Sequence, residues 1–313
     1  MDLIKPCRLK KGDLIGIISP ASTPDDLTRI EKGVKYLEKL GYNVEVGRNV
    51  GQNHGYLAGK DEARLEDLHY MFQKKEVKAV FSVRGGYGTP RLLDNIDYSI
   101  IKKNPKIFVG YSDITALQMA FLKKAGLVTF AGPMLAVDFW NDVSPFTEEM
   151  FWAMITSTKK FGKVTNPGGE KFHILRPGNA EGQLTGGNLS LIAALMGTGY
   201  LPPFKDTVLV IEEIGEPPYR IDRMFSQLKL SGVFRQISGV ILGRFVDCYE
   251  SDQFKKTLSL NDVIQDYLGN LDIPVIYNFK HGHIKDNITM AFGLNYRLNT
   301  SKCTVEITEN AVD

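Results

Sequence analysis

The chain has 313 residues, of which 43% are hydrophobic and 24% are charged, a balance that is typical of a globular protein and argues against disorder. The 38 basic and 36 acidic residues leave a net charge of +2, which gives no general attraction to nucleic acid or to an anionic membrane. No run of about 18 apolar residues is present, so we predict no membrane-spanning helix.

The N-terminal residues and the cysteines favour a cytoplasmic location. Residues 1–8 lack the apolar run between a basic start and a small-residue cleavage site that marks a signal peptide. The three cysteines, Cys7, Cys248 and Cys303, are far apart and form no C-x-x-C pair. We therefore expect reduced thiols, with neither a disulfide framework nor a zinc site.

The first 130 residues alternate short apolar runs with longer segments of helical periodicity. The pattern predicts strands at 14–18, 44–46, 77–81, 107–109 and 127–130, separated by helices at about 25–40, 61–75 and 113–124. Strands that alternate with helices imply right-handed crossovers. This half is therefore expected to be a doubly wound α/β domain with a mostly parallel sheet.

Residues from about 140 to 180 break this rhythm and are rich in turn signals. We predict a linker at 161–180, between an N-terminal domain at 1–160 and a smaller C-terminal α/β domain at 181–313. For the second domain we expect helices at 188–196, 219–230 and 260–268, strands at 208–211 and 239–242, and a β-rich tail near residues 275, 289, 296 and 304.

A glycine-rich loop, 84–88, directly follows the third predicted strand. Three glycines in four residues let the backbone approach a ligand and turn its N–H groups outward. A dinucleotide site is disfavoured because Arg91 occupies the place of the third glycine in G-x-G-x-x-G. A plain strand-to-helix turn and an anion or oxyanion site both remain open.

Ser112 lies between the fourth predicted strand and the next helix, at the sheet edge where such folds bind ligands. Gly110 leaves room for a sharp turn like that of a nucleophile elbow. Ile114 departs from the G-x-S-x-G pattern at its last glycine. The alternative is that Ser112 only caps the helix that begins at Asp113.

The buried strand at 208–211 ends in two carboxylates, Glu212 and Glu213. Adjacent residues of a strand point to opposite faces, so only one of them enters a given cleft, where it could orient a histidine. A solvated acidic turn is the alternative. Arg220 and Arg223 follow on one helical face, which is more typical of surface ion pairs than of substrate binding.

Two histidines, His281 and His283, flank a glycine in a late loop. They lack the further ligands, at recognisable spacing, that a metal site requires, so we predict no metal. An imidazole with its ordinary pKa near 6.5 suits a general base. A serine, then an acid, then a histidine is the chain order of a hydrolase triad on an α/β scaffold.

Five segments in this order resemble the LD-carboxypeptidases, serine peptidases that are also called muramoyltetrapeptide carboxypeptidases. The segments are 84–88, 110–115, 186–190, 212–213 with 219–223, and 282–283. Each is moderately specific alone, and together they are highly specific. The resemblance extends from about residue 12 to residue 300.

The resemblance implies that Ser112 is the nucleophile, that Glu212 and His283 complete the triad, and that the N–H groups of Gly86 and Asp113 form the oxyanion hole. The family commonly has Glu-Asp where this chain has the pair of glutamates. It also implies a doubly wound N-terminal domain, a smaller C-terminal domain and often a homodimer, with no metal or other cofactor. Candidate substrate-binding residues are Arg84, Arg220 and Arg223.

The reaction implied is removal of the terminal D-alanine from a cytoplasmic murein tetrapeptide, at the bond after the L-centre of diaminopimelate, in peptidoglycan recycling. Microcin C immunity peptidases share the triad and cleave peptidyl- or aminoacyl-nucleotides, which is one alternative. A non-catalytic protein that binds cell-wall peptides is another. An amidotransferase-like enzyme is disfavoured because no cysteine lies at a strand-to-helix turn.

Overall fold

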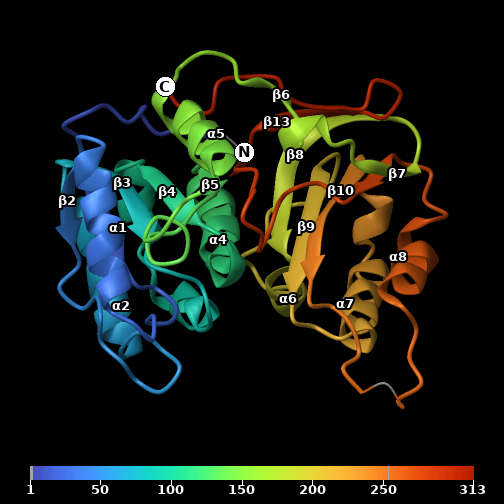
Figure 1. The fold of residues 1–313 in the computed structure, drawn as a ribbon, viewed down its shortest axis with the longest axis horizontal. Helices are drawn as coiled ribbons and strands as arrows, with labels where there is room; N and C mark the ends of the chain where they lie inside the picture. Colours follow the sequence, from blue (N-terminus) through green and yellow to red (C-terminus); the bar gives the residue numbers. More distant parts are fainter. Residues whose placement is uncertain (1–2, 253) are drawn as a thin grey trace.

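The computed structural model describes residues 3–252 and 254–313, which form two β-sheets with helices on their faces (Figure 1). The first sheet has six strands in the order β12-β5-β4-β3-β1-β2. Five of them are parallel, namely β1 (Leu14–Ile18), β2 (Asn43–Val46), β3 (Val77–Ser82), β4 (Ile107–Gly110) and β5 (Thr129–Ala131). The predicted doubly wound sheet is confirmed.

Helices and short turns of 3₁₀ helix connect these strands and cover the sheet. The longer connections are α1 (Thr28–Lys39), α2 (Asp61–Gln73), α3 (Tyr98–Lys103) and α4 (Thr115–Ala125). The 3₁₀ turns η1 (Thr89–Asn95) and η2 (Ser112–Ile114) directly follow the glycine loop and β4. Both lie at the carboxyl edge of the sheet, where α/β folds place their ligands.

The second sheet has eight strands in the order β6-β14-β13-β8-β9-β10-β11-β7. Its centre is parallel, from β8 (Asn179–Asn188) through β9 (Val208–Ile214) and β10 (Gly239–Val246) to β11 (Val275–Tyr277). The helices α6 (Leu189–Ala194), α7 (Pro218–Leu230) and α8 (Leu260–Leu268) belong to this half. Antiparallel strands extend both of its sides: β13 (Asn295–Asn299), β14 (Thr304–Ile307) and β6 (Gly162–Val164) on one, β7 (His173–Arg176) on the other.

The segment 161–180, predicted as a linker, contains two strands. This segment is not only a connection, because it supplies β6 and β7, the two edge strands of the second sheet. Before it, α5 (Pro145–Thr156) occupies part of the region where the sequence pattern weakens. After it, β12 (Met290–Phe292) leaves the second half of the chain and pairs antiparallel with β5 in the first sheet.

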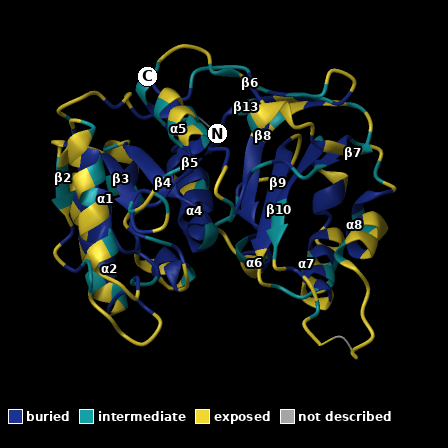
Figure 2. Ribbon diagram, in the orientation of Figure 1, coloured by how far each residue is buried: buried dark blue, intermediate teal, exposed yellow. Residues whose placement is uncertain are grey.

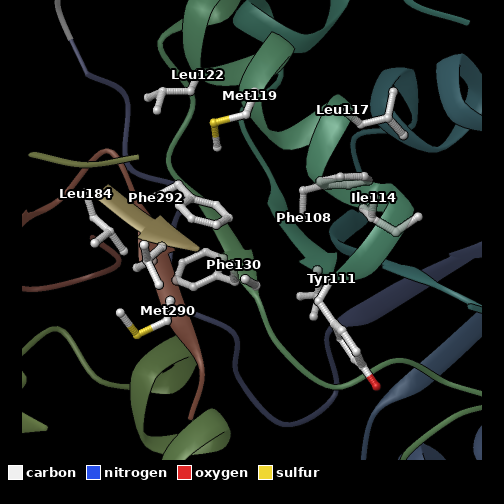
Figure 3. Packing of buried hydrophobic residues seen from close by; sticks show 14 of the residues in the cluster. Phe108, Tyr111, Ile114, Leu117, Met119, Leu122, Phe130, Leu184, Met290 and Phe292 are labelled. Atoms are coloured by element: carbon white, nitrogen blue, oxygen red, sulfur yellow. The ribbon is translucent and has the colours of Figure 1, made fainter. Parts of the chain in front are cut away.

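The two sheets share one apolar core, with α4 between them (Figures 1 and 2). Nine of the eleven residues of α4 are buried, since the helix contacts β5 of the first sheet and β8 and α6 of the second half. Figure 3 shows Met119 of α4 in one cluster with Phe130, Phe292 and Leu184, which come from both halves of the chain. This packing fixes the carboxyl edges of β4 and β9 in relation to each other.

Candidate active site

Ser112 lies on a sharp turn directly after β4. Its φ is +64°, a left-handed conformation that costs a non-glycine residue about 1 kcal/mol or more. A Cβ on Gly110 would approach the Ile114 side chain to 2.9 Å, so the turn depends on that glycine. Ile114 itself has φ −62° and ψ −19°, which explains why no glycine is needed there.

The Ser112 hydroxyl is not a helix cap. Helix α4 begins after Ile114, and neither α4 nor η2 has a capping side chain. Within the described part of the chain, the Ser112 hydroxyl forms no hydrogen bond, and the residue is partly exposed. An accessible, unpaired hydroxyl on a strained turn is the arrangement that a nucleophile requires.

The glycine loop packs directly on this turn. A Cβ on Gly85 would lie 2.9 Å from Ser112 Cβ and 3.1 Å from its Oγ. Ser22 anchors the loop from the other side, because its N–H donates to Gly85 O (3.3 Å) and its Oγ accepts from Tyr87 N (3.1 Å). The loop is therefore held against Ser112 from both sides.

Two backbone amides remain available near Ser112. Among residues 3–252 and 254–313, neither the N–H of Gly86 nor that of Asp113 donates a hydrogen bond. The Asp113 carboxylate is occupied elsewhere, since it accepts from Thr89 N (2.8 Å), while Thr89 Oγ1 donates to Asp113 O. These bonds tie the turn at Ser112 to the glycine loop and leave the two amides free to serve an oxyanion.

Glu212 and His283 form a buried pair at the ends of β9 and of the late glycine loop. His283 Nδ1 lies 2.7 Å from Glu212 Oε2, and the glutamate side chain is 1% exposed. Burial alone would lower the pKa of His283, but the hydrogen bond and charge of Glu212, with the charges of Glu213 and Asp138, raise it above its usual value. The other ring nitrogen, Nε2, is left for a second partner.

Gly282 and Gly243 make room for this pair. Gly282 has φ +123°, and a Cβ there would lie 2.8 Å from Glu212 Oε2. A Cβ on Gly243 would lie 3.1 Å from Glu212 Cβ. The glycine between the two histidines is thus required by backbone conformation and by the close approach of the glutamate.

The second histidine of the loop, His281, and the second glutamate of the strand, Glu213, have structural roles. His281 is 1% exposed, and its Nδ1 lies 2.8 Å from Ile288 O. Glu213 points away from Glu212, as alternation along a strand predicts. Its carboxylate accepts from Asn188 Nδ2 (3.0 Å) and from Ser190 N (2.8 Å) and Oγ (2.7 Å), which also accounts for the glycine-asparagine segment at 186–190.

Tyr111 brings the serine turn and the histidine loop together. Its ring meets the imidazole of His283 edge to face, with centroids 5.1 Å apart, and Tyr111 directly precedes Ser112. Figure 3 shows its phenol oxygen pointing away from the apolar cluster. No hydrogen bond joins Ser112 Oγ to His283 in the described residues, so the two groups are adjacent through Tyr111 but not bonded.

The three candidate arginines lie in different surroundings. Arg84 is partly buried, and its Nε has no hydrogen-bond partner among the described residues. Burial and the charges of Asp138 and Glu212 raise the pKa of the Tyr111 phenol well above its usual value, and the positive charge of Arg84 partly opposes this. Arg220 pairs with Glu216 at 3.2 Å, and Arg223 lies over the Tyr219 ring, 5.7 Å from its centroid. Both of these are exposed. Only Arg84 lies beside the serine turn.

Tyr111, Asp138, Ser22 and Thr89 were not identified from the sequence. Tyr111 could have been found, because it directly precedes the serine. The other three come from segments whose distance to the site depends on the tertiary fold. Their roles are to hold backbone and side chains in place, for which sequence offers no periodic signal.

Within the described ranges, no helix is both long and apolar enough to cross a membrane. The same ranges contain no group of three or more His, Cys, Asp or Glu side chains arranged to hold a metal ion. The three cysteines all carry free thiols.

Comparison with known proteins identifies the family. Residues 15–132 match the LD-carboxypeptidase N-terminal domain, and residues 181–298 match the LD-carboxypeptidase C-terminal domain. A probable murein peptide carboxypeptidase of Bacillus subtilis (strain 168) is 42% identical over 305 residues, which cover 97% of this chain and 94% of that protein.

Two solved structures are similar over nearly the whole chain. The muramoyltetrapeptide carboxypeptidase of Oxalobacter formigenes has a TM-score of 0.82 at 32% identity, with 94% of this chain and 97% of that chain covered. The microcin C7 self-immunity protein in its wild-type apo state has a TM-score of 0.89 at 27% identity, with 99% and 100% covered. The latter protein has also been solved with aspartyl sulfamoyl adenosine. Both domain matches and the full-length similarity lead to one conclusion: this chain belongs to the LD-carboxypeptidase family of serine peptidases.

Proposed function

We propose that this enzyme removes the terminal D-alanine from a murein tetrapeptide in the cytoplasm, as a step in peptidoglycan recycling. The observation that carries the proposal is the buried pair of Glu212 and His283 beside the strained turn that presents Ser112. The names of the relatives, which include murein peptide and muramoyltetrapeptide carboxypeptidases, support the substrate.

In this proposal Ser112 attacks the carbonyl of the bond before the terminal residue. Glu212 accepts a hydrogen bond from Nδ1–H of His283, which keeps the lone pair of Nε2 free to take the serine proton. Rotation of the Ser112 side chain, or substrate binding, would then close the Ser112–His283 contact, because such bonds often tighten only in the substrate complex. His283 returns the proton to the leaving amine, and water hydrolyses the acyl-enzyme.

The amides of Gly86 and Asp113 serve the oxyanion of the tetrahedral intermediate. Neither N–H group donates a hydrogen bond among the described residues; Asp113 directly follows Ser112, and Gly86 follows Gly85, which packs against Ser112. Asp113 N lies at the start of η2 and α4, where the helix dipole adds favourable charge. Loss of one such donor typically raises the barrier by about 3 kcal/mol.

Arg84 is the group we assign to the terminal carboxylate of the substrate. An exopeptidase must recognise a chain end, and a guanidinium suits a carboxylate because it can donate two parallel hydrogen bonds. Arg84 begins the glycine loop, and its Nε has no partner in the described part of the chain, whereas Arg220 and Arg223 already have partners on an exposed helix. Arg84→Gln should therefore raise KM for a tetrapeptide about 100-fold.

The alternative substrate is a peptidyl- or aminoacyl-nucleotide, favoured by the similarity to the microcin C7 self-immunity protein. The two functions separate when purified enzyme is incubated with a murein tetrapeptide and, in parallel, with an aminoacyl sulfamoyl adenosine. Mass spectrometry should show loss of D-alanine from the tetrapeptide. Cleavage of the nucleotide conjugate alone would reverse the assignment.

A protein that binds cell-wall peptides without cutting them is the remaining alternative. Ser112→Ala should abolish release of D-alanine and leave the affinity for the tetrapeptide nearly unchanged. If this variant hydrolyses the peptide at the wild-type rate, Ser112 is not the nucleophile. If wild-type enzyme binds the peptide without any release, the binding alternative holds.

We also propose that the enzyme is a homodimer, which rests on its family resemblance. Light scattering coupled to size-exclusion chromatography should give a mass of about twice that of one chain at micromolar concentration. A mass equal to one chain under these conditions would contradict this part of the proposal.

A further inference from the structure

A pocket of about 580 Å³ opens directly beside the proposed base. His283 and Tyr111 form part of its wall, so an occupant would lie next to the bond that Ser112 attacks. The pocket is much larger than the methyl group of an alanine. Its remaining wall is mostly apolar and includes Val137, Trp140, Val143, Ile214 and Ile284.

Two carboxylates, of Asp138 and Asp142, also line this pocket. Asp138 is the more deeply placed one, and its Oδ2 accepts from Met134 N at 2.8 Å. In the part of the chain that the structure describes, Asp138 forms no salt bridge. Lys285 lines the pocket too, but its residue is exposed and its charge is screened by water.

The Asp138 carboxylate is therefore a desolvated acid that pairs with no lysine or arginine among the described residues. Burial raises its pKa to about 6, against the opposing effects of the Met134 N–H, the Tyr111 phenol and the positive charge of His283. A bound cation would favour the ionised form and relieve this cost. The chemistry of the pocket, an apolar wall with an acid at depth, suits an aliphatic chain that ends in an ammonium group.

Electrostatics also decide which side of the scissile bond the pocket serves. The leaving residue carries the terminal carboxylate, which two aspartates would repel. That carboxylate is better placed near Arg84, as proposed above. The pocket is thus left for the residue on the acyl side, whose carbonyl Ser112 attacks.

We propose that this pocket binds the side chain of the residue that provides the scissile carbonyl, and that Asp138 binds a terminal ammonium group on that side chain. The inference rests on the proposed carboxypeptidase function and adds a specificity-determining residue to it. It predicts that the enzyme distinguishes side chains of equal length by their charge.

The test compares two tetrapeptides that differ only at this residue, one with lysine and one with norleucine, which has a similar chain and no ammonium. We expect kcat/KM for the lysine peptide to be at least about tenfold higher with wild-type enzyme, the value of a charge-assisted hydrogen bond. Asp138→Asn should reduce this ratio to about one, mainly by raising KM for the lysine peptide. Equal ratios in wild type and variant would overturn the proposal.

Glu149→Gln is the matched control, because Glu149 is an exposed carboxylate on α5 that does not line the pocket. It should keep the wild-type ratio. If Asp138→Asn fails to fold, the wild-type protein still provides a test. The preference for lysine should grow as pH rises through about 6, since Asp138 then ionises. A preference that is flat with pH would contradict the role of Asp138.

Binding to the inactive Ser112→Ala variant separates this inference from the proposed function. Calorimetry with the same two peptides should again favour lysine about tenfold, and the preference should disappear in Ser112→Ala combined with Asp138→Asn. If neither peptide is cleaved by wild-type enzyme but the binding preference is found, the proposed function fails and the pocket assignment stands. If both peptides are cleaved but bound equally, the proposed function stands and the pocket assignment fails.

Discussion

At the scale of single residues, the Glu212–His283 pair has the strongest geometry in the site. The Nδ1–Oε2 distance is 2.7 Å, and the other glutamate oxygen, Oε1, is buried without a partner among the described residues. A buried carboxylate with one unsatisfied oxygen is costly for stability. The arrangement therefore indicates that Glu212 orients the histidine, whereas Glu213 stabilises the fold by accepting hydrogen bonds from Asn188 and Ser190.

Glu212→Gln tests this division. Since Glu212 raises the pKa of His283, its removal should lower that pKa, and the acid limb of the kcat/KM profile should move to lower pH. The rate should also fall by about three to four orders of magnitude, because the imidazole loses its orienting acceptor. A pH–rate profile measures both effects, with Glu216→Gln as a control that leaves them unchanged. An unshifted acid limb would show that Glu212 does not act on the base.

Gly282→Ala should damage the site without unfolding the protein. The residue has φ +123°, and a Cβ would meet Glu212 Oε2 at 2.8 Å, so the loop or the glutamate must move. We expect kcat to fall at least about 100-fold, since displacements of about 1 Å have effects of this size. Steady-state kinetics and a thermal melt together provide the check. Full activity with a lowered melting temperature would mean that the glycine serves only the loop.

At the scale of elements, β9 connects the catalytic candidate to the scaffold. Glu213 lies near the end of this strand, and its buried carboxylate accepts hydrogen bonds from Asn188, Ser190 and the Ile214 amide (2.9 Å). These bonds fasten the end of β9 to the junction of β8 and α6. The neighbouring Glu212 is thereby placed by an anchor that faces the opposite side of the strand.

Glu213→Ala should destabilise the protein by about 2–4 kcal/mol, because several buried donors lose their acceptor. Urea unfolding should show a lower midpoint with an unchanged slope. Glu216→Ala removes only a surface ion pair with Arg220 and should cost less than about 1 kcal/mol. Equal losses in the two variants would contradict the anchoring role.

The elements that the sequence predicted well are those with strong apolar patterns. The five parallel strands of the first sheet and helices such as α2 and α8 lie within a few residues of their expected positions. The elements that it missed are short or are formed by tertiary contacts. The strands β6 and β7 have three and four residues, and α5 carries apolar side chains around much of its circumference. In each case packing partners, not local periodicity, determine the structure.

The same reasoning applies to the candidate site. Ser112, Glu212 and His283 each occupy a strand end or a glycine loop, so the sequence could suggest them. The contact between Tyr111 and His283 and the pocket around Asp138 depend on how the two sheets dock. No local pattern encodes that docking, because it arises from the shared core.

At the scale of the whole molecule, the two halves are joined more closely than a division at 161–180 suggests. The second half supplies β12 to the first sheet, and α4 of the first half packs on β8. The segment near residue 313 is tied to the start of the chain, since Arg8 N donates to Asp313 O (2.7 Å) and Asp313 N donates to Pro6 O (3.0 Å). The candidate site contains Ser112 from the first half and Glu212 and His283 from the second, so its geometry depends on how the two halves pack together.

We therefore expect the enzyme to unfold as one cooperative unit. Its two tryptophans, Trp140 and Trp152, both lie in the first half, so their fluorescence reports on that half, whereas far-UV circular dichroism reports on the whole chain. In guanidinium the two signals should give the same midpoint and the same slope. If the fluorescence transition precedes the dichroism transition, the halves are separate folding units. The site would then be assembled by docking two independently stable domains, and its activity would be lost before either domain unfolds.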